Sequence, residues 1–478
     1  MTWQGPIGNG SRFWSRRDCL ARTGSGFGLL ALSALLADVG ALGAQAGGDA
    51  PVSPRARPPA RAKSVIWCFM YGGPSGIDLF DYKPDLVRHD GKPFDGASEL
   101  QTFSGKVGPL MRPPFAFKRH GQCGQTVSDL YPNLARHVDS IAFLKSCHVE
   151  TNVHDQALFQ VNTGMTRLGF PSAGSWITYG LGSENRNLPG FVVMYDPRGI
   201  PVGGAPLWSS GFLPSIHGGT VFRQGASPIL NLQRPPGMSA AAQRRQLDFV
   251  AAMNREHQRA RPGEEALDAR IESFELAFRM QAEAPSAVDL SDETDETKRL
   301  YGIDAPASGT YGAQLLMARR LVERGCRMVQ VYSGGTNSDW DSHSKLEANH
   351  RLRAHETDKP IAGLLADLER RGLLDETLVI WGGEFGRLPM SEGGGGRDHN
   401  PHGFLMWMAG GGVRGGSSYG ATDEIGFRAA ENPVSVHDIH ATILHLLGLD
   451  HESLAFRHDG RDFRLTDVSG TVIREILA

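Results

Sequence analysis

Acids and histidines gather in glycine-rich polar clusters that follow predicted buried strands or open a predicted helix. The clusters occupy residues 72–81, 151–155, 334–343 and 382–387, and the last continues at 396–403. Imidazole and carboxylate groups suit zinc, manganese or a similar divalent ion, and no thiolate is placed with them. A bound metal ion polarises an ester and lowers the pKa of a water molecule. These residue types therefore suit metal-assisted ester hydrolysis.

Two short spacings supply candidate ligands within these clusters. Asp339 precedes His343 by four residues, and Asp398 and His399 stand just before His402. Each spacing alone also fits a surface pair, a helix cap or a polar loop. The case for a site comes from all the clusters jointly, because they follow predicted strands or open a predicted helix.

Three further side chains have both a functional and an ordinary interpretation. Arg387 and Arg397 could clamp an oxyanion as forks, although Arg387 could equally pair with a neighbouring acid. His154 opens a predicted helix, where it could face a substrate or be an ordinary helix residue. The sequence alone leaves these alternatives open.

The predicted elements would bring the clusters to one edge of a sheet. Alternating helices and buried strands favour a mostly parallel sheet that is covered on both faces. Ligands of such sheets bind at the carboxyl ends of the strands, where the clusters lie. The predicted strands are 64–71, 327–332, 377–381 and 404–409. The predicted helices are 154–164, 239–281 with a break at Pro262, 313–323, 357–371 and 436–447. Residues 286–297 are predicted to be an acidic loop.

Composition excludes several classes of protein. Of the 478 residues, 40% are hydrophobic and 21% are charged, which excludes global disorder and suits a large α/β domain. The net charge of -3 is not that of a nucleic-acid binder, so we expect no nucleic-acid partner. Five cysteines are too few for a disulfide-built scaffold, and their spacing establishes no pairing. The oligomeric state stays open.

The first residues are typical of a twin-arginine export signal. Arg16 and Arg17 precede a short apolar run at 27–37, and small residues at 44–46 offer a cleavage site. The apolar run is too short to span a bilayer, so no membrane span is expected after cleavage. We expect the twin-arginine export machinery as a partner and a periplasmic or extracellular location. The predicted organisation is a signal peptide at 1–46, a Pro- and Arg-rich linker at 47–63, and one domain at 64–478 with a helical insertion at about 239–297.

Five strings of the sequence carry a resemblance to a known family: GGPSGID, WDSH, WGGEFGR, GGGGRDHNPHGF and YGATDEIG. They resemble the bacterial, often twin-arginine-exported family called domain of unknown function 1501, within the alkaline phosphatase and sulfatase superfamily. The resemblance covers about 64–478. It implies an alkaline-phosphatase-like α/β fold, a three-layer α/β/α sandwich with a central, mostly parallel sheet. It also implies a metal centre at the carboxyl edge of that sheet.

Superfamily roles carry over to several positions. Asp339 and His343 match the Asp-x-x-x-His metal pair of alkaline-phosphatase-like enzymes. Glu384 follows a strand where those enzymes place an Asp-His pair. His399 or His402 would supply the last histidine of the superfamily pattern.

Two departures from the superfamily pattern affect the expected chemistry. The first strand ends in Gly72 and Gly73 where metal-binding Asp residues are expected, and Asp78 is the candidate substitute. The nucleophile is expected nine residues before Thr163, at the position that His154 occupies. His154 could be a ligand, a general base or a covalent nucleophile, or a metal-activated water could attack directly. No Cys/Ser-x-Pro-x-Arg string is present, so a formylglycine sulfatase mechanism is not expected.

The leading hypothesis is an exported, metal-dependent hydrolase of phosphate or sulfate esters in small molecules or polysaccharides. One or two divalent ions, Zn, Mn or Ca, would be the cofactor. His154 would face the substrate, and Arg387 or Arg397 would neutralise its oxyanion. The metal ligands would be Asp78, Asp339, His343, Glu384, His399 and His402.

The first alternative is a non-catalytic envelope binding protein that keeps the alkaline-phosphatase-like fold. The two departures from the superfamily pattern favour it. A second alternative is a carbohydrate-active protein whose eight Trp residues line a sugar cleft, and their scatter along the chain disfavours it.

Overall fold

The computed structural model describes residues 58–94, 96, 102–105, 107–223, 228–230, 232–260, 265–335 and 339–478. The predicted signal at 1–46, the first part of the predicted linker and Pro262 lie outside these ranges. Within them, no helix combines the length and the apolar character that crossing a membrane requires.

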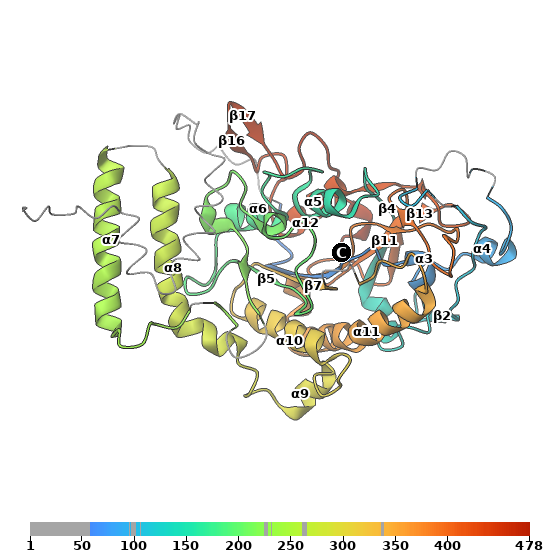
Figure 1. Ribbon diagram of the computed structural model, residues 1–478, viewed down its shortest axis with the longest axis horizontal. Helices are drawn as coiled ribbons and strands as arrows, with labels where there is room; N and C mark the ends of the chain where they lie inside the picture. Colours follow the sequence, from blue (N-terminus) through green and yellow to red (C-terminus); the bar gives the residue numbers. More distant parts are fainter. Residues whose placement is uncertain are drawn as a thin grey trace, which may run out of the picture.

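A nine-stranded sheet forms the centre of the molecule (Figure 1). Its middle strand is β1, Ser64–Met70, in which every residue is buried. β1 pairs in parallel with β7, Met328–Ser333, and with β8, Thr377–Gly382. A strand buried on both faces has a continuous apolar sequence, which is why these strands are visible in the sequence. The order across the sheet is β12 (Ser417–Tyr419), β4 (Ile141–His148), β11 (Phe404–Ala409), β8, β1, β7, β5 (Phe191–Met194) and β6 (Thr220–Val221), with β15 (Val434–Ser435) beside β4.

Most strand pairs of this sheet are parallel. β11 is antiparallel to both of its neighbours, β4 and β8. β12 and β15 run parallel to β4, and β5 runs parallel to both β6 and β7. The prediction of a mostly parallel sheet is confirmed.

Helices cover both faces of the sheet, which gives three layers (Figure 1). The side chains of β1 alternate between two cores, with Ile66 and Cys68 in the first and Val65 and Trp67 in the second. The predicted three-layer α/β/α sandwich is therefore confirmed. The first core includes residues of α10 (Gly309–Glu323) and α11 (Leu346–Arg370), and the second includes residues of α5 (His154–Thr163), α6 (Ala173–Leu181) and α12 (Val436–Leu446).

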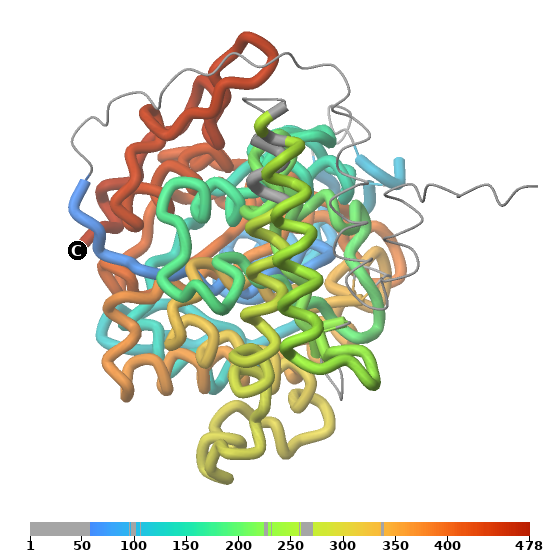
Figure 2. Tube along the Cα trace, turned by 90° about the vertical axis from the view of Figure 1, so that its left-hand side faces the viewer, coloured from blue at the N-terminus to red at the C-terminus, as the bar shows by residue number. Residues whose placement is uncertain are grey.

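Two long helices occupy the predicted helical stretch. They are α7, Ala240–Ala260, and α8, Glu265–Val288. The Arg244 guanidinium of α7 donates to both carboxylate oxygens of Glu275 in α8, at 2.9 and 2.6 Å. Figure 2 shows the two helices running alongside each other at one end of the molecule.

Two predicted element boundaries are wrong. Part of the predicted acidic loop at 286–297 is helical, because α8 continues into it and α9, Asp295–Leu300, begins inside it. The Thr294 hydroxyl caps α9, and acidic residues in its first turn suit the helix dipole. The predicted helix at 357–371 is only the second half of α11, since Pro360 lies inside that helix without ending it.

Glycine turns shape the edge of the sheet where β1 and β8 end. Gly72 and Gly73 have φ of 116° and 73°, which favours glycine at both positions. A Cβ atom on Gly73 would lie 2.8 Å from the Phe385 ring. The Gly72 N–H donates to Glu384 Oε1 at 2.9 Å, so the chain after β1 is tied to the chain after β8.

Candidate metal centre

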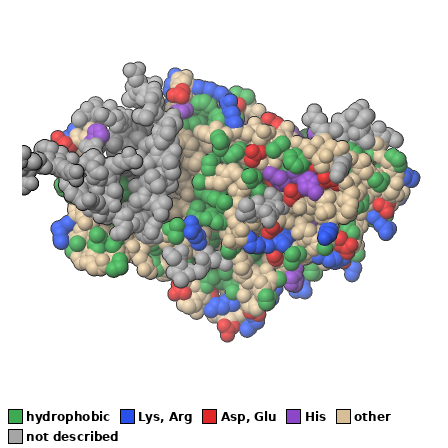
Figure 3. All heavy atoms as spheres, viewed as in Figure 1, with side chains coloured by type: hydrophobic (Ala, Val, Ile, Leu, Met, Phe, Trp, Pro, Cys, Tyr) green, Lys and Arg blue, Asp and Glu red, His purple; other side chains and the backbone are tan. Residues whose placement is uncertain are grey.

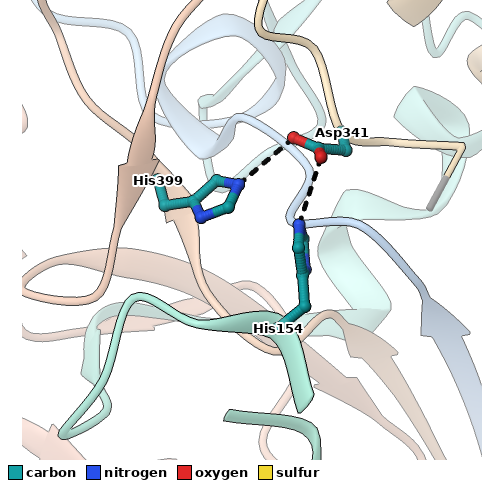
Figure 4. A group of neighbouring side chains, drawn as sticks. All are labelled: His154, Asp341 and His399. Atoms are coloured by element: carbon teal, nitrogen blue, oxygen red, sulfur yellow. Dashed lines mark hydrogen bonds and ion pairs between the residues drawn. The ribbon is translucent and has the colours of Figure 1, made fainter. Parts of the chain in front are cut away.

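Three histidines from separate segments meet around one carboxylate. His154 is the first residue of α5, and Asp341 and His343 lie between β7 and α11. His399 begins β10, His399–Asn400, which pairs with β9, Gly386–Arg387. Figure 4 shows the rings of His154 and His399 both directed at the Asp341 carboxylate.

The Nε2 atoms of all three rings converge on Asp341. His343 Nε2 lies 3.0 Å and His399 Nε2 lies 3.2 Å from Asp341 Oδ1. His154 Nε2 lies 3.3 Å from the other oxygen, Oδ2. His343 Nε2 and His399 Nε2 are themselves 3.0 Å apart. The Nε2 atoms of His343 and His399 therefore lie together at one oxygen of Asp341, and that of His154 lies at the other.

Each ring is held from behind through its Nδ1 atom. An acceptor at Nδ1 fixes that nitrogen as the N–H, so the lone pair of the neutral ring lies on Nε2 and points to the shared volume. This is the arrangement that protein ligands of a metal ion usually have. The acceptors are Glu384 Oε1 for His154, at 2.6 Å, Glu392 Oε2 for His343, and the Asn152 carbonyl for His399, at 2.7 Å.

The electrostatics of the cluster favour positive charge between the rings. Burial disfavours the charged form of His154, but hydrogen bonds to Asp341 and Glu384 outweigh it and raise its pKa. The Asp341 carboxylate also raises the pKa of His343. Burial, together with the charges of Arg387 and His154, lowers the pKa of His399 to about 4, so its ring is neutral. Without a metal ion, the raised pKa values of His154 and His343 favour protons on these two rings.

The pKa of Asp341 is held far below its ordinary range. Burial opposes this shift, but the Arg387 guanidinium and hydrogen bonds from the three imidazoles outweigh burial. Asp341 is therefore a permanent carboxylate at the centre of the cluster.

These residues fit a divalent cation. The donor set of three imidazole Nε2 atoms and one carboxylate suits zinc or manganese. The Nε2 atom of His154 is buried, and its contact with Asp341 Oδ2 is long, at 3.3 Å. Donor atoms of His154, Asp341 and His399 lie within 4.8 Å of one another, and so do those of His343, Asp398 and His399.

The cluster can be reached from solvent. The His343 side chain is 30% exposed and that of Asp341 is 20% exposed, whereas Glu384 behind them is wholly buried. Figure 3 shows histidine side chains next to acidic ones on the face of the molecule seen in Figure 1. The solvent-facing side of the cluster is therefore formed by His343 and Asp341, whereas the His399 side chain is wholly buried.

The two predicted oxyanion arginines have different surroundings. Arg387 is buried, donates to the carbonyls of Gly72 and Gly73, and places Nη2 2.6 Å from Asp341 Oδ1. Arg397 instead forms a buried, two-bond pair with Asp78, at 2.8 and 3.0 Å. Arg387 borders the cluster, whereas Arg397 is engaged in an ion pair beneath it.

Three of the predicted metal ligands lie outside the cluster. Asp78 is wholly buried and is occupied by Arg397 and the Ser75 hydroxyl. Asp339 Oδ2 is paired with Arg198 and Arg353, at 3.0 Å each. The His402 ring packs edge-on against Phe427, with the ring centroids 5.7 Å apart.

The other three predicted ligands lie in the cluster, although not all in the same way. His343 and His399 direct Nε2 at Asp341. Glu384 contacts His154 on the Nδ1 side of the ring, away from Asp341. Its carboxylate accepts from the Gly72 N–H and from His154 Nδ1. Glu384 is therefore placed to orient a ligand rather than to be one.

Sequence reasoning missed Asp341 and Glu392. Asp341 stands two residues before His343 inside the string WDSH, and Asp-x-His at a strand end was the signal available for it. The Asp-x-x-x-His spacing pointed instead to Asp339, whose side chain is turned to the arginines. Glu392 lies in a loop without any motif, and only the fold brings it to His343.

Comparison with known protein families gives one match that spans nearly all of the described chain. A family described as "Protein of unknown function (DUF1501)" matches residues 62–477. A comparison with curated protein sequences gave no match. The resemblance to the family expected from the five strings is confirmed.

Similar solved structures include a phosphonate monoester hydrolase, a sulfatase and an alkaline phosphatase. A phosphonate monoester hydrolase from Silicibacter pomeroyi is 10% identical, with TM-score 0.33, over 82% of this chain and 73% of that chain. A sulfatase from Pseudoalteromonas sp. is 12% identical, with TM-score 0.34, over 83% and 68%. A mutant of TAB5 alkaline phosphatase with Mg bound is 10% identical, with TM-score 0.31, over 73% and 92%. These likenesses are distant. The match over residues 62–477 shows that the chain belongs to the DUF1501 family of proteins of unknown function.

Proposed function

We propose that the chain is a metal-dependent hydrolase of phosphate or sulfate esters that is exported by the twin-arginine machinery to the periplasm or beyond. The observation that supports the hydrolase most is the convergence of three imidazole Nε2 atoms on Asp341, each ring held at Nδ1 by an acceptor. The twin arginine in the first residues supports export.

The proposed ligands of the cation are His154, Asp341, His343 and His399. Nitrogen donors favour zinc or manganese over calcium, which takes oxygen ligands. His399 belongs to both groups of convergent donors, and its Nδ1 is occupied by the Asn152 carbonyl. Because the remaining Nε2 lone pair binds a single ion, one cation at a time is the simplest occupancy.

Residues around the proposed cation site would have separate roles in hydrolysis. When bound, a divalent ion supplies Lewis acidity, which polarises an ester oxygen and acidifies a water molecule. Arg387 keeps a fixed positive charge beside Asp341, where negative charge develops on a transferring phosphoryl or sulfuryl group. Glu384 and Glu392 hold the rings of His154 and His343 in place, so no reorganisation is needed during the reaction.

Metal analysis together with substrate screening tests this proposal. The chain without residues 1–46 would be stripped of metal, reloaded with Zn or Mn, and assayed on a phosphomonoester, a phosphodiester and a sulfate ester. We expect about one ion per chain and turnover of at least one ester class. His399→Ala should lose both, whereas His402→Ala, a matched histidine outside the cluster, should keep both. A chain that binds no stoichiometric metal would contradict the proposal.

A second candidate is a ligand-binding protein without turnover. Within the described part of the chain, the polar contacts of the three rings run to carboxylates, a carbonyl and one another. No Ser, Thr or Cys side chain takes part in them, so a covalent nucleophile of the usual kind is not placed there. Stoichiometric metal and anion binding without hydrolysis of any ester class would favour this candidate.

A further inference from the structure

An exposed aromatic ring lies directly against the histidine cluster. Phe103 is 55% exposed. Its ring stacks on His399, with centroids 4.8 Å apart and planes at 30°, and lies 6.0 Å from the ring of His343. Phe103 therefore forms an apolar wall beside the convergent Nε2 atoms.

The residue after Phe103 fixes this wall to the cluster. The Ser104 N–H and hydroxyl both donate to Asp398 Oδ2, at 3.0 and 3.2 Å. The other oxygen of Asp398 accepts from the His399 N–H at 2.7 Å and lies 3.9 Å from His343 Nδ1. One carboxylate thus ties the segment that carries Phe103 to the backbone of His399.

We infer that Phe103 is the specificity-determining residue of the site and selects esters whose alcohol part is a ring. This inference rests on the proposed function. A ring bound beside the cation would cover the exposed part of Phe103, through aromatic stacking or through the apolar face of a sugar. A small acyclic alcohol part would leave Phe103 uncovered and gain nothing from it.

Binding of paired, non-hydrolysable anions tests the inference without requiring turnover. Calorimetry on the zinc-loaded chain would compare phenylphosphonate with methylphosphonate, and benzenesulfonate with methanesulfonate. We expect the phenyl compound of the preferred pair to bind about tenfold more tightly. Phe103→Ala should remove this preference and leave the affinity for the methyl compound and the zinc content unchanged. Phe103→Trp should retain the preference.

One control variant and the zinc-binding measurement separate the inference from a merely structural role of the ring. Phe249→Ala removes an aromatic ring that is 63% exposed on α7, away from the cluster, and should change nothing. If Phe103 only supported the imidazoles, Phe103→Ala would weaken zinc binding, or would weaken both members of a pair equally. Either result would overturn the inference.

The remaining outcomes are also decisive. Anion binding without a preference for the ring, or a preference that survives in Phe103→Ala, would overturn the inference and leave the proposed function standing. Zinc-loaded chain that binds none of the four anions would overturn both. A separate comparison of glucose 6-phosphate with glycerol 3-phosphate tests whether a sugar ring gains the same advantage as a phenyl ring. An advantage that depends on Phe103 would support the inference.

Discussion

His154 Nδ1 lies 2.6 Å from Oε1 of Glu384, a carboxylate that is wholly buried behind the histidine cluster. The same carboxylate accepts from the Gly72 N–H, in the turn after the central strand of the sheet. The orientation of one proposed ligand is therefore set by the backbone of the fold. This relationship gives the first prediction.

Glu384→Gln should weaken metal binding without unfolding the chain. The amide keeps the size of the side chain but loses the charge that fixes the His154 ring, and such outer partners typically contribute 10- to 100-fold to metal affinity. Zinc titration against a competing chelator would measure the change. Glu392→Gln should act similarly through His343. Unchanged affinity in both variants would contradict the supporting role of the two acids.

Metal binding should release protons and become tighter as the pH rises. The pKa values of His154 and His343 are raised, so both rings carry protons in the metal-free chain below those raised values, and the cation must displace them. His399, whose pKa is about 4, should release none near pH 7. Calorimetry in buffers of different ionisation enthalpy would count the protons. Binding that releases no protons near pH 6 would contradict this assignment.

The contribution of His154 and His343 to the stability of the metal-free chain should show the opposite dependence on pH. A histidine whose pKa is raised by folding stabilises the fold below its unfolded pKa, and this contribution is lost as the pH rises through the folded value. For His154 and His343 the loss should occur above about pH 6.5, the ordinary histidine pKa. The rise in Tm on adding zinc should therefore grow from pH 6 to pH 8. A rise that shrinks over this range would be inconsistent with the two raised pKa values.

Asp78→Asn should destabilise the fold rather than remove a ligand. It leaves the Arg397 guanidinium buried without its charge partner, a loss that typically costs about 3 kcal/mol or more of the free energy of unfolding. Urea unfolding would measure the cost, and metal analysis of the folded fraction should still find one ion. Asp462→Asn, which breaks an exposed pair with Arg457, should leave stability nearly unchanged. Loss of metal from folded Asp78→Asn protein would instead restore Asp78 as a ligand.

Thiol labelling should distinguish one cysteine from three others. The cysteines of the described residues are free, and Cys123 is exposed. Burial raises the pKa of Cys68, Cys147 and Cys326 to about 12 each, so their thiolates are scarce as well as inaccessible. In the chain without residues 1–46, only Cys123 should react quickly with a disulfide reagent, as peptide mapping would show. Rapid labelling of a buried thiol would contradict the packing of β1, of β4 or of the turn before β7.

Much of the sheet could be predicted from the sequence, because its central strands are buried on both faces. The apolar runs of β1 and β8 stop at glycine pairs, and the helix that begins at His154 follows a polar loop. β4 was not predicted, although it lies inside the sheet, because Lys145 and Ser146 interrupt its apolar run. Its position depends on pairing with β11, which the local sequence does not encode.

The candidate site could be predicted only in part. Strand ends bring His343 and His399 to one edge, as the topology of an open parallel sheet predicts. Which acid of a loop turns inward depends on its neighbours in space. Asp339 faces Arg198 and Arg353 across the chain, whereas Asp341 faces the imidazoles. Neither arginine is near Asp339 in the sequence, so no spacing rule separates the two acids.

The most direct test of the metal centre is anomalous diffraction at the zinc edge from crystals of the zinc-loaded chain. The proposal predicts one peak about 2.0 to 2.2 Å from Nε2 of His154, His343 and His399, with Asp341 completing the site. A peak at Asp78, Asp339 or His402, or crystals that contain no zinc between the three rings, would contradict it.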